Sequence, residues 1–189
     1  MPETAAPALL SAGALEALLA LARATAAAAV RGEPLPPLPP LAEGAEPRGV
    51  FVSLHRRGEL RGCLGRLEAD LPVVEAVRRM AVAATRDDPR FPPVRPSELR
   101  DLDVEVSVLS PAAPVRPEDV VPGRDGLIVQ RGSRMGVLLP QVAAEEGWDR
   151  LTFLRGVCRK AGLTPESWRE AGTALYAFQA QVVPGRGAT

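Results

Sequence analysis

Apolar residues recur at helical spacing in three long stretches of the chain. They lie three and four positions apart in residues 8–31, 70–86 and 149–161, a spacing that gives a helix one buried face. Gly13 disfavours an early start in the first stretch, so that helix is expected to begin nearer Ser11. Each stretch therefore predicts an amphipathic helix.

Residues with capping preferences mark the ends of these helices. Gly32 follows the first stretch and Gly162 follows the third, as expected of residues that end a helix in a left-handed conformation. Asp70 precedes the second stretch and is expected to cap its N-terminus, with Pro72 in the first turn.

Alternation of apolar and polar residues predicts the strands. The segments cover residues 50–55, 60–67, 103–110, 126–131, 135–139 and 174–183. Arg57-Gly58 separates the first two segments and Gly132-Ser133-Arg134 separates the fourth and fifth, so we predict two antiparallel hairpins with glycine-containing turns.

The chain shows no internal repeat and no boundary long enough to divide it into independent domains. We expect one compact domain over residues 8–183 and a disordered tail over 184–189. Residues 33–40 contain five prolines and are expected to form an extended surface connector. A ligand for an SH3-type groove is the alternative for this segment, and the connector is favoured.

Charge and composition narrow the classes of function. The 23 basic and 23 acidic residues balance, so there is no overall electrostatic case for binding nucleic acid. Polar residues such as Glu16 and Arg23 interrupt the Ala-rich run near the N-terminus, which therefore predicts neither a signal peptide nor a membrane span. The two cysteines, Cys63 and Cys158, are far apart and suggest no disulfide framework. We expect a cytoplasmic, reduced protein.

The usage of basic and amide residues is strongly biased. Lys160 is the only lysine among 23 basic residues, Ile128 is the only isoleucine, and the chain has no Asn. A GC-rich genome accounts for all three features. Avoidance of thermolabile Asn in a thermophile accounts for the last one and is ranked second.

The segment Leu60-Arg61-Gly62-Cys63-Leu64-Gly65, the signature segment below, is the first candidate site. Glycine weakens the interior of a strand and often marks a bulge or a close approach of backbone, so two glycines here are unusual. Arg61 lies two positions from Cys63 and would favour a thiolate. Leu67 would share a face with Leu64 only if a bulge near Gly65 shifted the alternation.

A catalytic thiol also needs a base in contact with it. His55 is the only histidine. With a two-residue turn, Cys63 is expected opposite Val52 and on the other face of the hairpin from His55; a three-residue loop restores a common face but separates the two by roughly 13 Å. Neither register forms a dyad, so a small buried cysteine is favoured over a functional thiol.

Other kinds of site have weaker support. One histidine and two distant cysteines do not form a zinc site of the usual spacing, and we predict no metal site and no cofactor. Asp87 and Asp88, Asp103 and Glu105 could in principle form an acid–base pair or hold Mg²⁺. Adjacent acids at a helix end are more often solvated or paired with nearby arginines, here Arg86 and Arg90.

Several segments, in their order and spacing, resemble the AMMECR domain family over roughly residues 8–183. The hallmark of that family is Leu-Arg-Gly-Cys-Ile-Gly, and Leu64 replaces the isoleucine here. The segments are GVFVSLHRRGELRGCLGRLE, ATRDDPRFPPV, DLDVEVSVLSP, DGLIVQRGSRMGVLLPQVA and GWDRLTFLRGVCRKAGL.

The resemblance implies a compact α+β unit with a mainly antiparallel sheet flanked by helices, often described as two lobes around a cleft. It places Arg61, Gly62, Cys63 and Gly65 on the signature surface of the family, and His55 outside it. A second recurring segment matches Arg86, Asp87 and Arg90, with Pro89 and Phe91, and a third matches Gln141 with Pro140. The domain is sometimes joined to MEMO-type and radical-SAM-type domains, which hints at a shared pathway and implies no reaction.

Three functional hypotheses follow. The first is a binding or accessory module that holds a small anionic metabolite, or an acidic segment of a protein partner, against Arg61 and the Arg86–Arg90 loop. The second is an enzyme with Cys63 as nucleophile or redox thiol, for which a carboxylate such as Asp87 or Glu105 is the only plausible base. The third is a purely structural motif. No membrane partner is expected.

Overall fold

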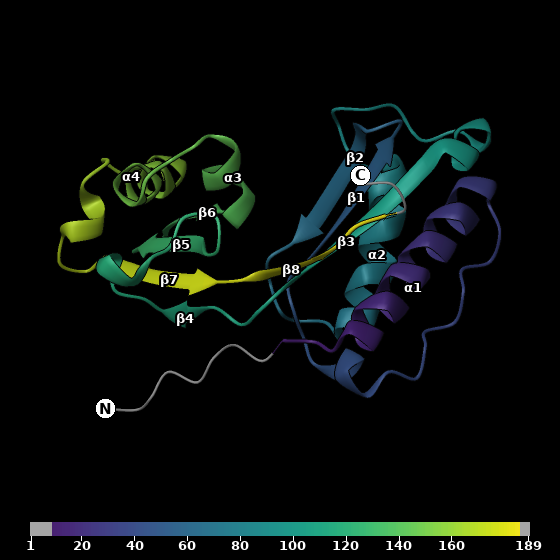
Figure 1. Ribbon diagram of the computed structural model, residues 1–189, viewed down its shortest axis with the longest axis horizontal. Helices are drawn as coiled ribbons and strands as arrows, with labels where there is room; N and C mark the ends of the chain where they lie inside the picture. Colours follow the sequence, from purple (N-terminus) through teal and green to yellow (C-terminus); the bar gives the residue numbers. More distant parts are fainter. Residues whose placement is uncertain (1–8, 186–189) are drawn as a thin grey trace. The chain divides into compact units, whose positions relative to one another are not determined.

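Two four-stranded sheets and their covering helices make up the structure, a computed structural model that describes residues 9–185 (Figure 1). The predicted α+β class, with antiparallel sheets and flanking helices, is confirmed. Contacts along the chain divide it into two compact units. The signature unit comprises residues 9–109 and 181–185 among those described, and the second unit comprises residues 110–180.

The sheet of the signature unit has the strand order β2-β1-β3-β8. Its strands are β1 (Val50–Arg56), β2 (Glu59–Arg66), β3 (Leu102–Leu109) and β8 (Ala180–Val183). β1 is antiparallel to both β2 and β3, so β2 is an edge strand.

Two helices, α1 (Ala12–Arg31) and α2 (Val73–Arg86), pack against each other and against this sheet (Figure 1). The valines and leucine at alternate positions of β1 and β3 enter their shared core; these are Val50, Val52, Leu54, Val104, Val106 and Val108. Since successive strand residues point to opposite faces, the residues between them lie on the face away from the helices.

The caps of α1 agree with the sequence. The Ser11 side chain accepts a hydrogen bond from the Ala14 amide, and Gly32 ends the helix at φ 70°. Within the described residues, α1 is the one helix long and apolar enough to cross a membrane, but it is a core helix here, with Leu18 and Ala22 fully buried.

The predicted cap of α2 is wrong. The helix begins after Pro72, which provides no side-chain cap, and the Asp70 carboxylate instead accepts a hydrogen bond from Arg66. Arg66 of β2 binds the carboxylate that was expected to cap the helix, and the spacing of apolar residues does not reveal this pairing. The predicted Glu75–Arg79 pair on α2 is confirmed, with a distance of 2.8 Å.

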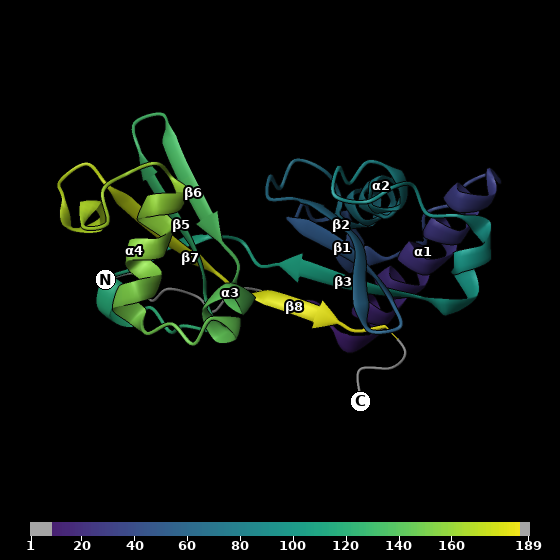
Figure 2. The same cartoon turned by 90° about the horizontal axis from the view of Figure 1, so that it is seen from above.

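The second unit contains a sheet of order β4-β7-β5-β6. Helix α4 (Arg150–Lys160) lies beside β5 and β6 in both views (Figure 2), and its buried Phe153, Leu154 and Val157 pack with Leu127 and Val129. The other elements are β4 (Ala113–Pro114), β5 (Gly126–Arg131), β6 (Arg134–Leu138), β7 (Ala174–Phe178) and α3 (Pro140–Glu145).

Four short 3₁₀ segments complete the described chain: η1 (Ala42–Ala45), η2 (Pro96–Asp101), η3 (Pro117–Asp119) and η4 (Ser167–Arg169). The proline-rich residues 33–40 form no helix or strand. Of the predicted 184–189 tail, residues 186–189 lie outside the described residues, as does residue 8 of the first predicted helix.

The final predicted strand is two strands. Residues 174–183 form β7 in one sheet and β8 in the other, with Gln179 between them. The Gln179 amide donates to Ser110 Oγ at 2.9 Å, and its carbonyl accepts from the Ser110 amide at 2.8 Å. Alternation continues through such a change of sheet, so the pattern of the sequence does not reveal it.

Candidate functional site

The signature segment lies on β2, in the hairpin formed with β1. The predicted two-residue turn is confirmed, with Arg57 at φ 55° and Gly58 at φ 85°. The pairing of His55 with Leu60 agrees with a two-residue turn, but the predicted register is wrong from the next pair on, because Leu54 pairs with Gly62. Arg61 is therefore the extra residue of a β-bulge, which lies at this position and not near Gly65.

The bulge moves Cys63 opposite Ser53, and not opposite Val52. Ser53 also pairs with Glu105 on β3, and His55 pairs with Asp103. Residues directly opposite each other on antiparallel strands share a face. Ser53, His55, Cys63, Asp103 and Glu105 therefore lie together on the sheet face away from the helices. We call these five residues the polar face.

The polar face brings the thiol and the imidazole to the same side, contrary to the sequence expectation for a two-residue turn. All five of its residues are half-buried. Ser53 Oγ donates a hydrogen bond to Cys63 Sγ at 3.3 Å. Among the hydrogen bonds of residues 9–185, none joins Cys63 Sγ to His55 or to a carboxylate. The thiol thus has a hydroxyl neighbour but no base in contact.

The backbone of Cys63 is held by the loop after α2. Its amide donates to Asp88 Oδ2 at 2.8 Å, and its carbonyl accepts from Arg90 Nη2 at 3.2 Å. Arg90 also pairs with Asp88 at 2.7 Å. These two side chains take the positions that a further strand would occupy along β2, so the loop closes the edge of the sheet at Cys63.

Asp88 is a buried carboxylate, with 4% of its surface exposed. The Arg90 side chain, followed by the Cys63 and Arg90 amides, lowers the pKa of Asp88 against the opposing effect of burial. The sequence grouped Asp88 with solvated or paired acids at the end of a helix. Its pairing with Arg90 is as predicted, but no local signal distinguished it from the exposed Asp87, which lies 3.5 Å from Arg86.

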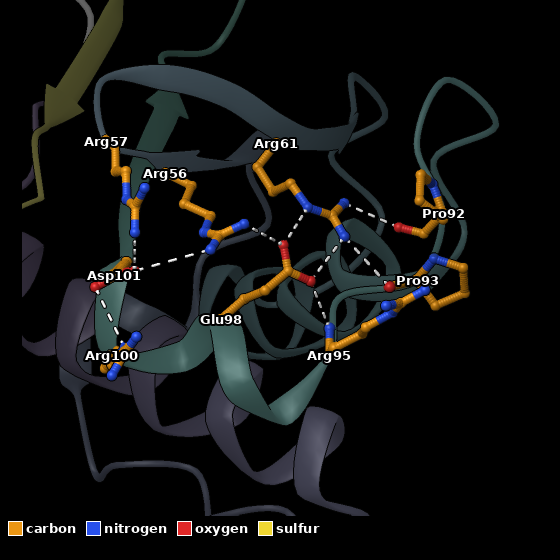
Figure 3. Close-up of polar contacts among 9 residues, drawn as sticks. All are labelled: Arg56, Arg57, Arg61, Pro92, Pro93, Arg95, Glu98, Arg100 and Asp101. Atoms are coloured by element: carbon orange, nitrogen blue, oxygen red, sulfur yellow. Dashed lines mark hydrogen bonds and ion pairs between the residues drawn. The ribbon is translucent and has the colours of Figure 1, made fainter.

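Arg61 is committed to partners inside the protein (Figure 3). Its Nε and Nη2 donate to the two oxygens of Glu98, at 2.9 and 3.1 Å. Its Nη1 donates to the Pro92 carbonyl at 2.9 Å, and Nη2 also reaches the Pro93 carbonyl at 3.3 Å. All three guanidinium nitrogens are thus bonded within the signature unit, although the sequence suggested an external anion for this residue.

Glu98 is a buried carboxylate that the sequence did not single out. It is 8% exposed and also accepts hydrogen bonds from the Arg95 amide at 2.8 Å and from Arg56 at 3.4 Å. The Arg61 side chain and then the Arg95 amide lower its pKa to about 2. Glu98 therefore ties the bulge of β2 to the N-terminal end of η2.

Both glycines of the signature segment are explained by packing. A Cβ at Gly62 would lie 2.5 Å from the Ala84 carbonyl oxygen of α2. A Cβ at Gly65 would overlap the ring of Phe51, its cross-strand partner. A close approach of backbone, one of the predictions for these glycines, is confirmed at Gly62, where α2 is the neighbour, whereas the space at Gly65 is filled by an aromatic ring.

Of the other predicted site residues, one contacts the signature segment, two lie at the end of α2, and one lies in the second unit. Arg90 is brought to Cys63, whereas Arg86 and Asp87 form an exposed pair at the C-terminal end of α2. Gln141 lies in α3 of the second unit, and its Oε1 is buried with no hydrogen-bond partner among the described residues. Within residues 9–185, no three His, Cys, Asp or Glu side chains are placed to hold a metal ion.

Comparison with known proteins places this geometry in a family. The AMMECR1 family model matches residues 19–183, which includes both units. The chain belongs to the AMMECR1 family.

Its relatives include proteins of thermophilic archaea. A Methanothermobacter thermautotrophicus protein is 50% identical over 142 residues, covering 71% of this chain and 74% of the relative. Protein PF1979 of Pyrococcus furiosus is 45% identical over 148 residues, covering 72% and 70%. The crystal structure of the uncharacterized protein PH0010 from Pyrococcus horikoshii is 41% identical, with a TM-score of 0.79 and 92% coverage of both chains. These sources fit the thermophile explanation for the missing Asn.

Proposed function

We propose that this AMMECR1-family chain is a binding module whose ligand site is the polar face. The observation that carries the proposal is a set of half-buried groups without partners. The carboxylates of Asp103 and Glu105 and the imidazole of His55 have no hydrogen bond or ion pair within the described part of the chain. No nitrogen or oxygen of these three side chains is shut off from solvent, so all three groups are available to a ligand. A ligand would supply the missing partners.

The surroundings of the face support binding over catalysis. Asp88 and Arg90 bond to the backbone of Cys63, and Glu98 bonds to the side chain of Arg61, so β2 is held at two nearby residues. Rigid support favours specific recognition because little conformational freedom is lost on binding. A nucleophile would need a base within about 3 Å. Among the described residues, the neighbours of Cys63 Sγ are the Ser53 hydroxyl and the Arg90 guanidinium, and neither is a base.

The charge of the face indicates the class of ligand. Asp103 and Glu105 carry negative charge, while the guanidinium of Arg61 is already bonded to Glu98. We therefore replace the anionic metabolite expected from the sequence with a small ligand, or a segment of a protein partner, that presents amino or amide donors to the two carboxylates. Ser53 and Cys63 would contact its less polar part.

A titration of the ¹⁵N-labelled protein with a panel of primary amines, amino acid amides and polyamines tests the proposal. We expect at least one member of the panel to shift the amide resonances of Ser53, Cys63 and Glu105 with saturation. Glu105→Gln should weaken that binding about tenfold or more, as the loss of a charged hydrogen bond does. Asp119→Asn, which removes an exposed carboxylate from the second unit, is the matched control.

Two outcomes would contradict the proposal. One is that no amine in the panel perturbs the three resonances. The other is that Glu105→Gln and Asp119→Asn bind the responding amine as tightly as the unmodified protein, because the response would then not depend on the polar face.

A further inference from the structure

A solvent-open pocket of about 710 Å³ lies in the signature unit at the β1–β2 turn. It is lined by Arg23 of α1, by Arg57 and Gly58 of the turn, and by residues 100–103 at the junction of η2 and β3. Three arginines from three separate elements therefore converge on one pocket, which we call the arginine pocket.

Positive charge is in excess in the arginine pocket. Arg23, Arg57 and Arg100 face only two acids, Asp101 and Asp103, among the lining residues. Arg23 is half-buried and has no ion pair or hydrogen bond from its side chain within the described residues. An unpaired guanidinium in a pocket is a donor fork suited to carboxylate or phosphate oxygens.

The other two arginines already show how an anion is held there. Asp101 Oδ2 lies 3.2 Å from Arg57 Nη2, and its Oδ1 lies 3.7 Å from Arg100 Nε (Figure 3). The Arg57 and Arg100 side chains are 72% and 81% exposed. Exposed pairs of this kind contribute little to stability, so both guanidinium groups can turn toward a second anion at small cost.

The conformation of Arg57 singles out this position. Among the described residues other than glycine, Arg57 is the one with positive φ, at 55°. Asn, Asp and Gly are the residues that usually take this place in a two-residue hairpin turn. An arginine held there despite the backbone cost is the kind of outlier that indicates a functional constraint.

We infer that the arginine pocket binds the phosphate group of a phosphorylated small molecule, with Arg23, Arg57 and Arg100 as its ligands. The arginine pocket and the polar face share Asp103, but this inference rests on the three arginines and not on the proposed amine ligand. The sequence predicts an anion site at Arg61. The inferred anion site lies in the same unit, but at the turn of the hairpin.

Isothermal titration of the full chain with pyrophosphate at fixed ionic strength tests the inference. We expect saturable binding at one site that weakens as NaCl is added, because salt screens exposed charges. Arg23→Gln and Arg100→Gln should each weaken binding about tenfold or more. Arg116→Gln is the matched control, since Arg116 is exposed and lies in the second unit.

A charge variant of the opposite sign sharpens the test. Asp101→Asn removes the carboxylate that competes for Arg57 and Arg100, so it should tighten pyrophosphate binding, whereas Asp119→Asn changes the net charge equally and should not. Arg100 is exposed, so its variant is expected to fold, as its melting curve will show. The inference is overturned if no saturable binding occurs, or if Arg116→Gln weakens binding as much as Arg23→Gln and Arg100→Gln do.

Discussion

At the scale of single residues, the signature segment separates into a scaffold and a surface. Arg61 and the backbone of Cys63 are held by the buried carboxylates Glu98 and Asp88. The Cys63 thiol instead belongs to the polar face, together with Ser53. The arginine that looks most functional in the sequence is therefore a structural residue. Of the two carboxylates that hold the segment, the sequence named Asp88 as a partner of Arg90 but did not single out Glu98.

Glu98 provides the pH test of the scaffold. Its pKa in the folded protein is about 2, below its ordinary 4.5, so its ionised form stabilises the fold above pH 4.5 and this contribution is lost as the pH falls toward 2. Glu98→Gln should lower the free energy of unfolding by about 2–3 kcal/mol at pH 7, because Arg61 loses its charged partner. The difference should shrink markedly at pH 2.5.

Urea unfolding of the two proteins at both pH values measures this difference. Glu59→Gln is the control, because Glu59 is exposed at the start of β2 and forms no pair with the rest of the described chain. A Glu98→Gln effect that is equal at the two pH values would show that the ionised carboxylate is not the stabilising group.

At the scale of elements, the hairpin is fixed on both sides by close packing. Gly62 allows the C-terminal end of α2 to approach β2, and the Asp88–Arg90 loop then closes the strand edge. Because the loop begins where α2 ends, the position of the helix on the strand determines whether Asp88 and Arg90 can reach the backbone of Cys63. The segments around residues 60–65 and 86–91 thus pack together and support each other, although they lie apart in the sequence.

Gly62→Ala tests the contact between helix and strand. The added Cβ would lie 2.5 Å from the backbone oxygen of Ala84, which cannot rotate away, so we expect a loss of about 2 kcal/mol or more in the free energy of unfolding. Gly13→Ala in α1 is the matched control; a Cβ there meets nothing within 4 Å, and the change should stabilise the helix by about 0.5–1 kcal/mol. Equal stability of Gly62→Ala and the unmodified protein would refute the packing argument.

At the scale of the whole molecule, the patterns of the sequence predict local structure better than the site. The long helices, the hairpins and the two-residue turn at Arg57-Gly58 follow from spacing and turn chemistry, and the structure contains them. Alternation does not reveal a single inserted residue, so the bulge at Arg61 was missed and Cys63 was assigned the wrong partner. It is equally blind to the change of sheet at Gln179.

The partners of buried charges were the least predictable feature. Glu98 is 37 positions from Arg61, and Asp88 is 25 positions from Cys63, and nothing local marks either contact. The family match over residues 19–183 includes all four of these residues and Gln141 in the second unit. The scaffold leaves His55, Asp103 and Glu105 of the polar face without a partner among the described residues, and the proposed binding function rests on these groups.

The free energy of unfolding of Glu105→Gln tests this central claim most directly. If Glu105 is kept unpaired for a ligand, removing its charge should leave the protein without ligand as stable as before or up to about 1 kcal/mol more stable, as is common when functional groups are replaced. Chemical denaturation of both proteins at pH 7 gives the comparison. A loss of more than about 1 kcal/mol would show that the carboxylate has a structural partner and would contradict a ligand site at the polar face.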